Sequence, residues 1–229
     1  MNHHICCICS QIRGDAANDL LAHLIGSREY VRRVTLESDA FAVIPSIGPL
    51  VRGHVLLCPK MHFKSFAQIP STLEAEFDGM KKRLSSLLRR TYGRRVHCFE
   101  HGSAKKARQP LCTVEHAHIH FVPTDVEIWP DIENKFEWHA QKDIGTLTEI
   151  VGEMEYLWYE SPEGLSVVTS GIEGTFESQY LRKVFAKAVG LDDAWNWRDF
   201  PRSEVVTETY ATMQQITSSQ DSDGTALRT

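Results

Sequence analysis

The sequence predicts an α+β fold in which an antiparallel meander sheet packs against one long helix. The first observation is a series of apolar segments separated by turns, which favours antiparallel pairing because parallel strands need long crossovers. The second is a single longer stretch, 71–92, whose apolar residues recur at helical spacing. The predicted strands of this sheet are 29–37, 40–44, 53–59, 95–100 and 113–122.

The N-terminal part of the chain is expected to form a short helix followed by two strands. The helix covers 15–26, with Asp15 as a plausible N-cap and Gly26 as its stop. The first two strands then meet across a turn at Ser38 and Asp39, whose residue types favour turns.

The third strand and the long helix have clear boundaries. The strand stops at Pro59, because proline cannot donate a backbone hydrogen bond to a sheet. The helix is expected to begin with a capping box made by Ser71 and Glu74, and Gly93 ends it. Its basic residues are interpreted as a solvated face.

After residue 123 the pattern changes, with an irregular, aromatic stretch over 128–142. The elements expected after it are a helix over 143–151, a hairpin of 155–160 and 165–169, a helix over 178–189 and a last helix over 203–216. No linker separates the two parts, so we divide the chain into a domain over 1–123, an α/β extension over 124–217 packed on it, and a disordered tail over 218–229.

Composition excludes several classes of function. The chain has 229 residues and a net charge of −5 with both signs interspersed, which argues against a protein that coats nucleic acid. No apolar run reaches the roughly 20 residues of a membrane span, and the N-terminus lacks the features of a signal peptide. We therefore expect a cytoplasmic protein whose 6 cysteines are free thiols or metal ligands.

His116, His118 and His120 alternate with apolar residues. Alternate side chains of a strand share one face, so the three imidazoles should point the same way while Ala117 and Ile119 face a core. A half-buried strand does not require imidazoles, and the alternative is a surface strand or a chance cluster. Neutral imidazole is a metal ligand and a nucleophile or base, so we favour a chemical site.

Cys6 and Cys9 form a C-x-x-C pair that alone fits half a zinc site, a redox motif or chance. A redox pair is expected in a βαβ context, and none is visible. Two thiolates with two imidazoles would close a tetrahedral zinc site, and the chain also offers His62 and His116.

These motifs together resemble the histidine triad (HIT) superfamily. The segment 116–122 resembles its signature, the segment 53–62 resembles a second signature, and the N-terminal cysteine pair resembles that of its zinc-containing branch. The likeness covers about 6–123. It implies a HIT-like meander sheet with a helix, a homodimer, and hydrolysis or transfer of nucleoside monophosphates through a covalent histidine–phosphate intermediate.

Carried over by position, the resemblance assigns roles to single residues. His118 becomes the nucleophile, His120 contacts the phosphate or the leaving group, and His54 supports this network. Thr113 falls where the family has Ser or Thr and would donate to a phosphate oxygen. The resemblance also implies a structural zinc held by Cys6, Cys9, His62 and His116.

Departures from the family pattern indicate an unusual substrate. Ser46 stands where many members bind the ribose with an acidic residue or Asn, and Leu111-Cys112 replace Gly-Gln. Gln179 and Arg182, one turn apart at the start of a helix, could replace the missing phosphate contact or form an exposed face.

We therefore expect a nucleotide hydrolase that cleaves a P–N bond, with a nucleotide-conjugated peptide or amine as substrate. The alternatives are a dinucleoside polyphosphate hydrolase, a nucleotidyltransferase, and a nucleotide-binding protein without turnover.

Overall fold

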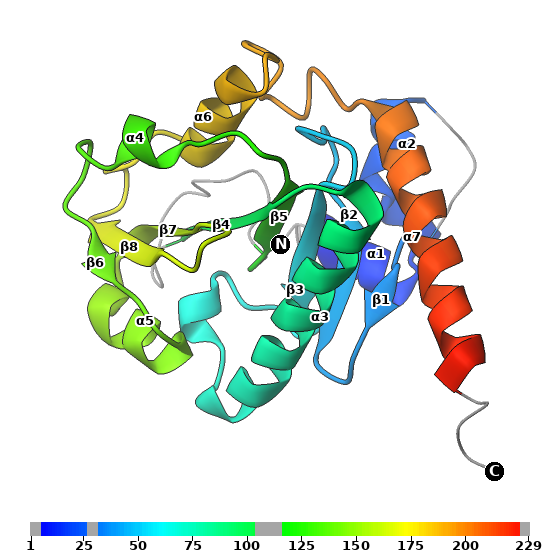
Figure 1. The fold of residues 1–229 in the computed structure, drawn as a ribbon, viewed down its shortest axis with the longest axis horizontal. Coiled ribbons are helices and arrows are strands. Elements are labelled where there is room, and N and C mark those ends of the chain that lie inside the picture. The colour runs from blue at the N-terminus through cyan, green and yellow to red at the C-terminus, as the bar shows by residue number, and fades with distance from the viewer. Residues whose placement is uncertain (1–5, 27–31, 104–115, 225–229) are drawn as a thin grey trace.

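The computed structural model describes residues 6–26, 32–103 and 116–224 (Figure 1). Its strands form one eight-stranded sheet in the order β1-β2-β3-β5-β4-β7-β8-β6, and all neighbours are antiparallel. This confirms the predicted α+β class. The strands are β1 (Leu36–Glu37), β2 (Phe41–Pro45), β3 (Val55–Pro59), β4 (Val96–Gly102), β5 (Ile119–Pro123), β6 (His139–Ala140), β7 (Glu155–Glu160) and β8 (Ser166–Gly171).

The N-terminal elements differ from the prediction. An unpredicted helix, α1 (Cys7–Arg13), comes first, and the expected helix over 15–26 divides into the 3₁₀ turn η1 (Ala16–Asn18) and the short helix α2 (Leu20–Leu24). The side chain of Asp15 caps η1, while Asp19 caps α2 by accepting from Leu21 N and Ala22 N. Two Asx caps close together thus interrupt what the sequence pattern suggested was one helix.

The capping box expected at Ser71 does not form. Residues Ser71–Leu73 make the 3₁₀ turn η3, and α3 (Glu74–Tyr92) begins after it without a side-chain cap. The carboxylate of Glu74 instead accepts a hydrogen bond from Ile144 N at 2.9 Å. The carboxylate that the local pattern assigned to the helix cap therefore accepts its hydrogen bond from a residue far away in the sequence.

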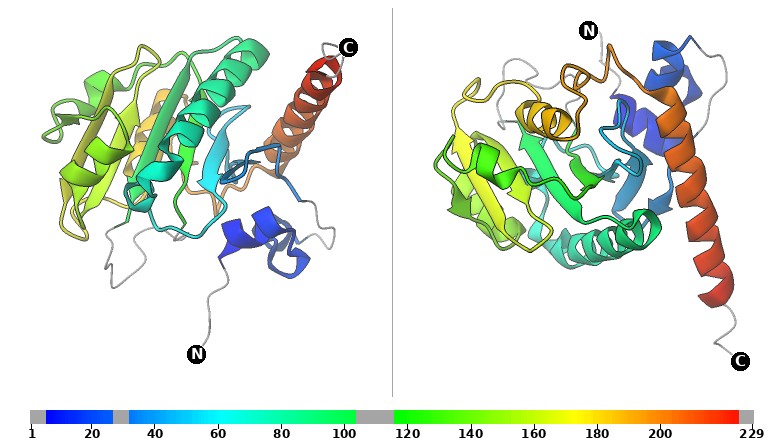
Figure 2. Two further views of the ribbon diagram at one scale, coloured as in Figure 1. Left: turned by 90° about the horizontal axis from the view of Figure 1, so that it is seen from below. Right: turned by 45° about the horizontal axis from the view of Figure 1, so that its top comes forward.

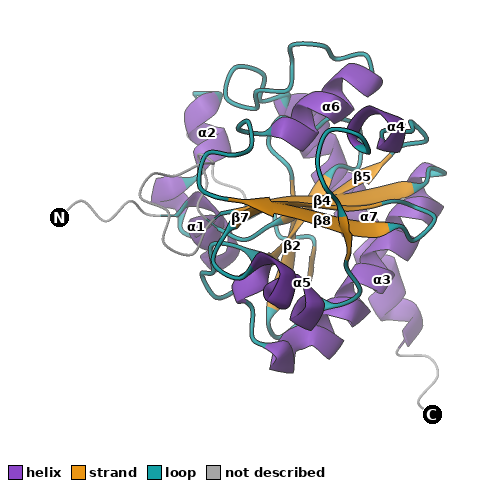
Figure 3. Ribbon diagram, turned by 90° about the vertical axis from the view of Figure 1, so that its left-hand side faces the viewer, coloured by secondary structure: helices purple, strands orange, loops and turns teal. Residues whose placement is uncertain are grey.

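Helices cover both faces of the sheet (Figure 3). On one face, α3 and α5 (Ile144–Val151) pack on a core that includes Ala117, Ile119 and Phe121. On the other face, α4 (Trp129–Ile132) and α6 (Tyr180–Ala188) pack around Phe99 and Leu157, while α1 packs on the adjoining part of β2 and β3. The buried positions of Ala117 and Ile119 agree with the predicted spacer face.

The residues after 123 extend the same sheet, because β7 pairs with β4. Both edges of β4 are therefore occupied within one chain. Gly102 makes the close approach possible, since a Cβ there would lie 2.1 Å from a ring carbon of Tyr156. The Tyr156 hydroxyl donates to Glu100, a buried carboxyl at the end of β4.

The last helix, α7 (Ser203–Gly224), lies beside β1 and β2 at the edge of the sheet (Figure 2). It continues past residue 216, where the sequence suggested an end, into the segment expected to be a disordered tail. Thr209 on this helix accepts from Gly53 N at 3.1 Å, and Gln214 donates to Val34 O at 2.8 Å. Among the described residues, no helix is long and apolar enough to span a membrane.

Candidate active site

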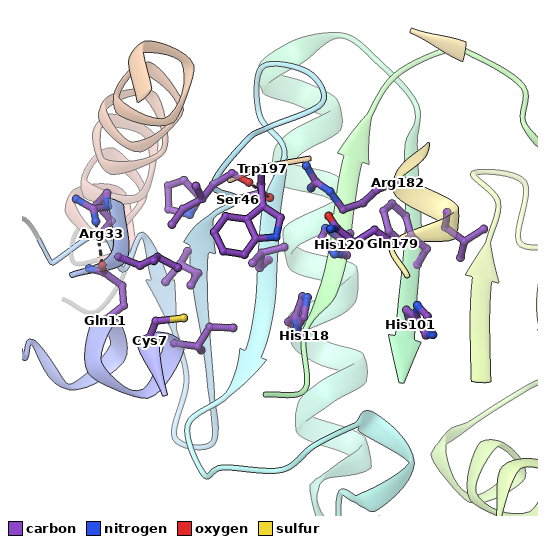
Figure 4. Close-up of a pocket in the computed structure, with 18 residues that line it drawn as sticks. Cys7, Gln11, Arg33, Ser46, His101, His118, His120, Gln179, Arg182 and Trp197 are labelled. Carbon is purple, nitrogen blue, oxygen red and sulfur yellow. Dashed lines mark hydrogen bonds between the residues drawn. The ribbon is translucent and has the colours of Figure 1, made fainter. Parts of the chain in front are cut away.

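A pocket lies between α1 and α6 on one face of the sheet (Figure 4). The period of two along each strand decides which residues reach it. Val43 and Leu57 point to the α3 core, whereas their neighbours Ile44 and Leu56 line the pocket. One end of the pocket is mainly apolar; the other carries the polar side chains of His101, His118, His120, Gln179 and Arg182.

Four potential metal ligands lie close together beside this pocket. They are Cys6, Cys9, His62 and His116, and we call them the thiol cluster. Their ligand atoms all lie within 4.8 Å of one another. The Sγ of Cys9 is 3.4 Å from His62 Nδ1 and 3.3 Å from His116 Nδ1, and Cys6 Sγ is 3.4 Å from the same nitrogen of His116. In a tetrahedron with zinc bond lengths of about 2.0–2.3 Å, ligand atoms are roughly 3.3–3.8 Å apart.

The donor set of the thiol cluster also fits zinc chemically. His116 Nε2 donates to Pro59 O at 2.8 Å, so the hydrogen of the neutral ring is on Nε2 and the lone pair of Nδ1 faces the thiols. Burial lowers the pKa of His116 to about 4, which favours this neutral form. Cys7 is outside the cluster, and burial raises the pKa of its thiol to about 11.

His118 presents a free ring nitrogen to the pocket. Its Nδ1 lies 2.6 Å from the carbonyl oxygen of His116. A carbonyl only accepts, so Nδ1 carries the hydrogen and, in the neutral ring, Nε2 keeps its lone pair. Burial lowers the pKa of His118. The residues 116–118 precede β5, which begins at Ile119, so this geometry belongs to a turn-like approach and not to the regular strand expected over 113–122.

A chain of hydrogen bonds fixes the hydrogen of His120 as well. Leu50 N donates to His54 Nδ1 at 3.0 Å, so the hydrogen of neutral His54 is on Nε2. That hydrogen points to His120 Nδ1 at 2.8 Å, which places the hydrogen of His120 on its own Nε2. Burial, the largest cause, holds the pKa of both rings well below the ordinary value. We call His54, His118 and His120 the imidazole cluster.

The plane of the His120 ring is held by aromatic stacking. It stacks on Phe99 with ring centroids 4.4 Å apart and planes 12° apart, and Phe99 in turn stacks on Phe185 of α6 at 5.1 Å. Phe99 and His120 are register partners across β4 and β5. The sheet and α6 together therefore orient the ring.

Three of the four substrate-binding residues predicted from the sequence are found at the pocket. Ser46, Gln179 and Arg182 line the pocket, but Thr113 lies outside the described residues. Ser46 Oγ donates to Ile47 O at 3.3 Å. The buried guanidinium of Arg182 donates to Gly48 O at 2.6 Å and to Trp195 O at 3.0 Å. Arg182 thus ties α6 to the loop between β2 and β3.

Two residues that sequence reasoning did not single out also belong to this site. His101 lines the pocket, and its Nε2 is 2.6 Å from the buried carboxylate of Glu155. The strand predicted from the sequence ends at residue 100. An alternation count starting at Phe99 would have placed His101 on the pocket face, but nothing local indicated its partner in β7.

Comparison with known proteins finds one matching family model and several solved structures with partial similarity. Residues 27–127 match the model of the HIT domain. A hypothetical histidine triad nucleotide-binding protein from Sulfolobus tokodaii is 25% identical, with 45% of this chain and 67% of that chain covered and a TM-score of 0.35. A zinc-bound histidine triad family protein from Mycobacterium smegmatis is 27% identical, with 45% and 72% covered and a TM-score of 0.34.

A HIT family protein from Bacillus anthracis covers more of the chain. It is 16% identical, with 64% of this chain and 92% of that chain covered and a TM-score of 0.41. No curated protein matches the sequence. The match to the HIT domain model covers residues 27–127, which is less than half of the chain.

Proposed function

We propose that this chain, whose residues 27–127 match the model of the HIT domain, is a nucleotide hydrolase acting through a covalent intermediate on His118. The observation that supports this most is the arrangement of ring hydrogens. His118 has a lone pair on Nε2, and His120, two residues away with ring centroids 5.0 Å apart, has a hydrogen on Nε2. A nucleophile and a hydrogen-bond donor thus share one end of the pocket.

The proposed reaction has two steps. In the first, the Nε2 lone pair of His118 attacks the α-phosphorus, a P–N bond forms, and the bond to the leaving group breaks as that group takes up a proton from solvent water. His120 donates its Nε2 hydrogen to a phosphate oxygen and so stabilises the developing charge. In the second step water attacks phosphorus and releases a proton to the solvent, the P–N bond to His118 breaks and restores the Nε2 lone pair, and a nucleoside monophosphate leaves.

The apolar end of the pocket supports a nucleoside as the bound group. Ile8, Ile44 and Leu56 offer flat apolar surface, and Trp197 lines the same pocket. Ser46 borders this end and is the proposed ribose contact, while Gln179 and Arg182 border the phosphate end. Because α6 belongs to the part of the chain after 123, we propose that this part selects the leaving group, with a phosphoramidate of an amine or peptide favoured.

Zinc is proposed to have a structural role. Four protein ligands would fill its coordination sphere and leave no position for a water nucleophile. The cluster joins α1 to residue 116, so it would fix the floor of the pocket and the carbonyl that orients His118.

The homodimer implied by the family stays a prediction. Both edges of β4 are already paired within the chain, with β5 and with β7. A second copy would therefore have to use another surface, such as the outer strands β1 and β6.

Trapping of the intermediate tests the proposed function. The protein is mixed with an adenosine or guanosine 5′-phosphoramidate, or with the matching dinucleoside polyphosphate, quenched, digested and analysed by mass spectrometry. We expect a nucleotidyl adduct on the peptide that contains His118, formed faster from the phosphoramidate. An adduct that discharges only to an added acceptor would identify a transferase. Absence of any adduct and any turnover would contradict the proposal and favour a binding protein.

A further inference from the structure

Gln179 lines the polar end of the pocket and has a strained backbone. It is the N-cap residue of α6, and its φ of 59° and ψ of 27° lie in the left-handed region. Residues other than glycine rarely adopt this conformation, because Cβ then approaches the backbone closely. An N-cap side chain usually accepts from a backbone amide of the first turn, but Gln179 makes no such bond. Helix capping therefore does not explain this conformation, and strained residues often occur at functional sites.

The side-chain oxygen of Gln179 is a buried acceptor. Within the part of the chain that the structure describes, Gln179 Oε1 has no hydrogen-bond partner. An amide oxygen can accept two hydrogen bonds, and a buried oxygen that accepts none costs free energy. Figure 4 shows this side chain extending from the start of α6 toward His120. The pocket thus contains an acceptor that a ligand with a hydrogen to donate would satisfy.

The neighbouring donors are directed to other groups. Arg182, one turn further along α6, donates to Gly48 O at 2.6 Å and to Trp195 O at 3.0 Å. The Nε2 hydrogen of His120 contacts a phosphate oxygen in the proposed function. Neither group donates to Gln179 Oε1 in the structure. A hydrogen for this oxygen therefore has to come from the ligand.

The chemistry of the ligand follows from which of its atoms carry a hydrogen. The oxygens of an ionised phosphate and of a P–O–P bridge only accept, so they cannot satisfy Gln179 Oε1. The ribose hydroxyls can donate, but the proposed function places them at Ser46, toward the apolar end. The nitrogen of a P–NH–R group also carries a hydrogen, and it lies next to the phosphorus that His118 attacks. A P–NR₂ nitrogen carries none.

We propose that Gln179 Oε1 accepts the hydrogen of a scissile P–NH–R group and thereby selects phosphoramidates of primary amines. This inference rests on the proposed function and names the substrate class of that site. When the P–N bond breaks, its electron pair stays on the nitrogen, which takes up a proton from solvent water and leaves as R–NH₂. The N–H bond that faces Gln179 does not break. Gln179 therefore positions the leaving nitrogen without exchanging a proton.

A pair of substrates that differ at the scissile nitrogen tests this contact. The methylamine and dimethylamine phosphoramidates of one nucleoside are compared in single-turnover formation of the His118 adduct. Gln179→Met has a side chain of similar length without the amide oxygen. We expect this variant to lower the ratio of the methylamine rate to the dimethylamine rate about 10-fold, through loss of one hydrogen bond. Comparison of ratios cancels the intrinsic difference in reactivity between the two substrates. Gln215→Met, at an exposed position of α7, is the matched control.

Two further comparisons separate this role from a structural one. Gln179→Glu keeps an oxygen acceptor and adds a negative charge near the phosphate, so both substrates should react more slowly while their ratio stays as in the native protein. A dinucleoside polyphosphate has no N–H at the scissile bond and should lose less rate in Gln179→Met than the methylamine substrate does.

Several outcomes would overturn the proposal. Gln179→Met could slow every substrate equally or leave the methylamine rate unchanged. Loss of the ratio in Gln179→Glu as well would assign the contact to the NH₂ group of Gln179. An effect confined to hydrolysis of the adduct would place the attacking water at this side chain instead of the leaving amine.

A binding measurement distinguishes failure of this inference from failure of the proposed function. If the native protein forms no adduct with any of these substrates, the proposed function fails, and calorimetry with the two phosphoramidates then tests the contact. Tighter binding of the methylamine compound that Gln179→Met removes would support the acceptor role without catalysis. Equal binding of the two compounds by the native protein, or the same preference in the variant, would reject it.

Discussion

The thiol cluster and the imidazole cluster use the same residue type for opposite purposes, although His116 and His118 are two positions apart. In the thiol cluster, Pro59 O takes the Nε2 hydrogen of His116 and directs Nδ1 to two sulfurs. In the imidazole cluster, the carbonyl of His116 takes the Nδ1 hydrogen of His118 and leaves Nε2 to the pocket. The difference shows that backbone acceptors set which ring nitrogen keeps its lone pair, and this suits one ring to the proposed metal site and the next to the proposed nucleophilic attack.

The largest effect is expected for His118→Ala, which tests the separate roles proposed for the two clusters. Removal of the nucleophile should lower adduct formation by about 10⁴-fold or more, because no other described ring presents a lone pair at that point. Zinc content and thermal stability should match those of the native protein, since the thiol cluster is intact. His139→Ala, at an exposed position of β6, serves as the matched control. A variant that keeps more than about a tenth of the rate would identify another nucleophile.

Loss of one thiol should disrupt the thiol cluster. Cys9→Ser removes the sulfur that approaches both imidazoles, and we expect metal analysis to show much less than one zinc per chain. The free energy of unfolding should fall by several kcal/mol, because metal binding is coupled to folding. Cys7→Ser is the matched control, since its thiol lies outside the cluster. Equal zinc content in both variants would show that the four residues do not bind the metal together.

His54 tests the chain of ring hydrogens that prepares His120. His54→Ala breaks the donor to His120 Nδ1 and should reduce the rate of adduct formation roughly 10- to 100-fold, as for other groups that orient a ligand or catalyst. His54→Gln can present an amide hydrogen to the same nitrogen and should be milder. If the two variants are equally impaired while both remain folded, the hydrogen-bond chain is not what His54 contributes.

The smallest effect concerns Glu100, whose side chain points away from the pocket. Burial raises its pKa to about 8, from an ordinary value of 4.5. Between these two values the native protein retains a proton that the unfolded chain has lost. Stability from this group is therefore fully present below pH 4.5 and is lost as pH rises through about 8.

Its contribution to the slope is at most about 1.4 kcal/mol per pH unit. Glu100→Gln should remove this part of the pH dependence, and its amide can still accept from Phe66 N through oxygen while its NH2 group donates to the Tyr156 hydroxyl. Denaturant unfolding at several pH values measures it. Parallel stability curves for the variant and the native protein would contradict the assignment.

The sequence patterns predicted some elements of the fold and missed others, and each miss has a physical reason. The alternation through Ala117 and Ile119 predicted the spacer face, because the period of a strand is a local property. The division of residues 15–26 into η1 and α2 was missed, since the caps at Asp15 and Asp19 compete for one short segment. Ser71 looked like a cap, but Glu74 has a better donor in Ile144, which is 70 residues away.

Prediction of the site was limited in the same way, by contacts between residues far apart in the sequence. His54, His118 and His120 could be predicted to lie together because their motif spacing is itself informative, and their roles stay a prediction. The role of Arg182 could not, because its partners, the carbonyls of Gly48 and Trp195, become neighbours only when α6 packs over the loop. His101 could be placed on a face by counting, yet its partner Glu155 depends on the pairing of β4 with β7.

That pairing has a further consequence for how the protein should behave on dilution. Because β4 and β7 belong to one chain, the effective concentration of Glu155 at His101 is set by the fold and not by the amount of protein. The described polar end of the pocket is assembled by one polypeptide. Specific activity should therefore stay constant as the protein is diluted, whichever surface, if any, two copies share.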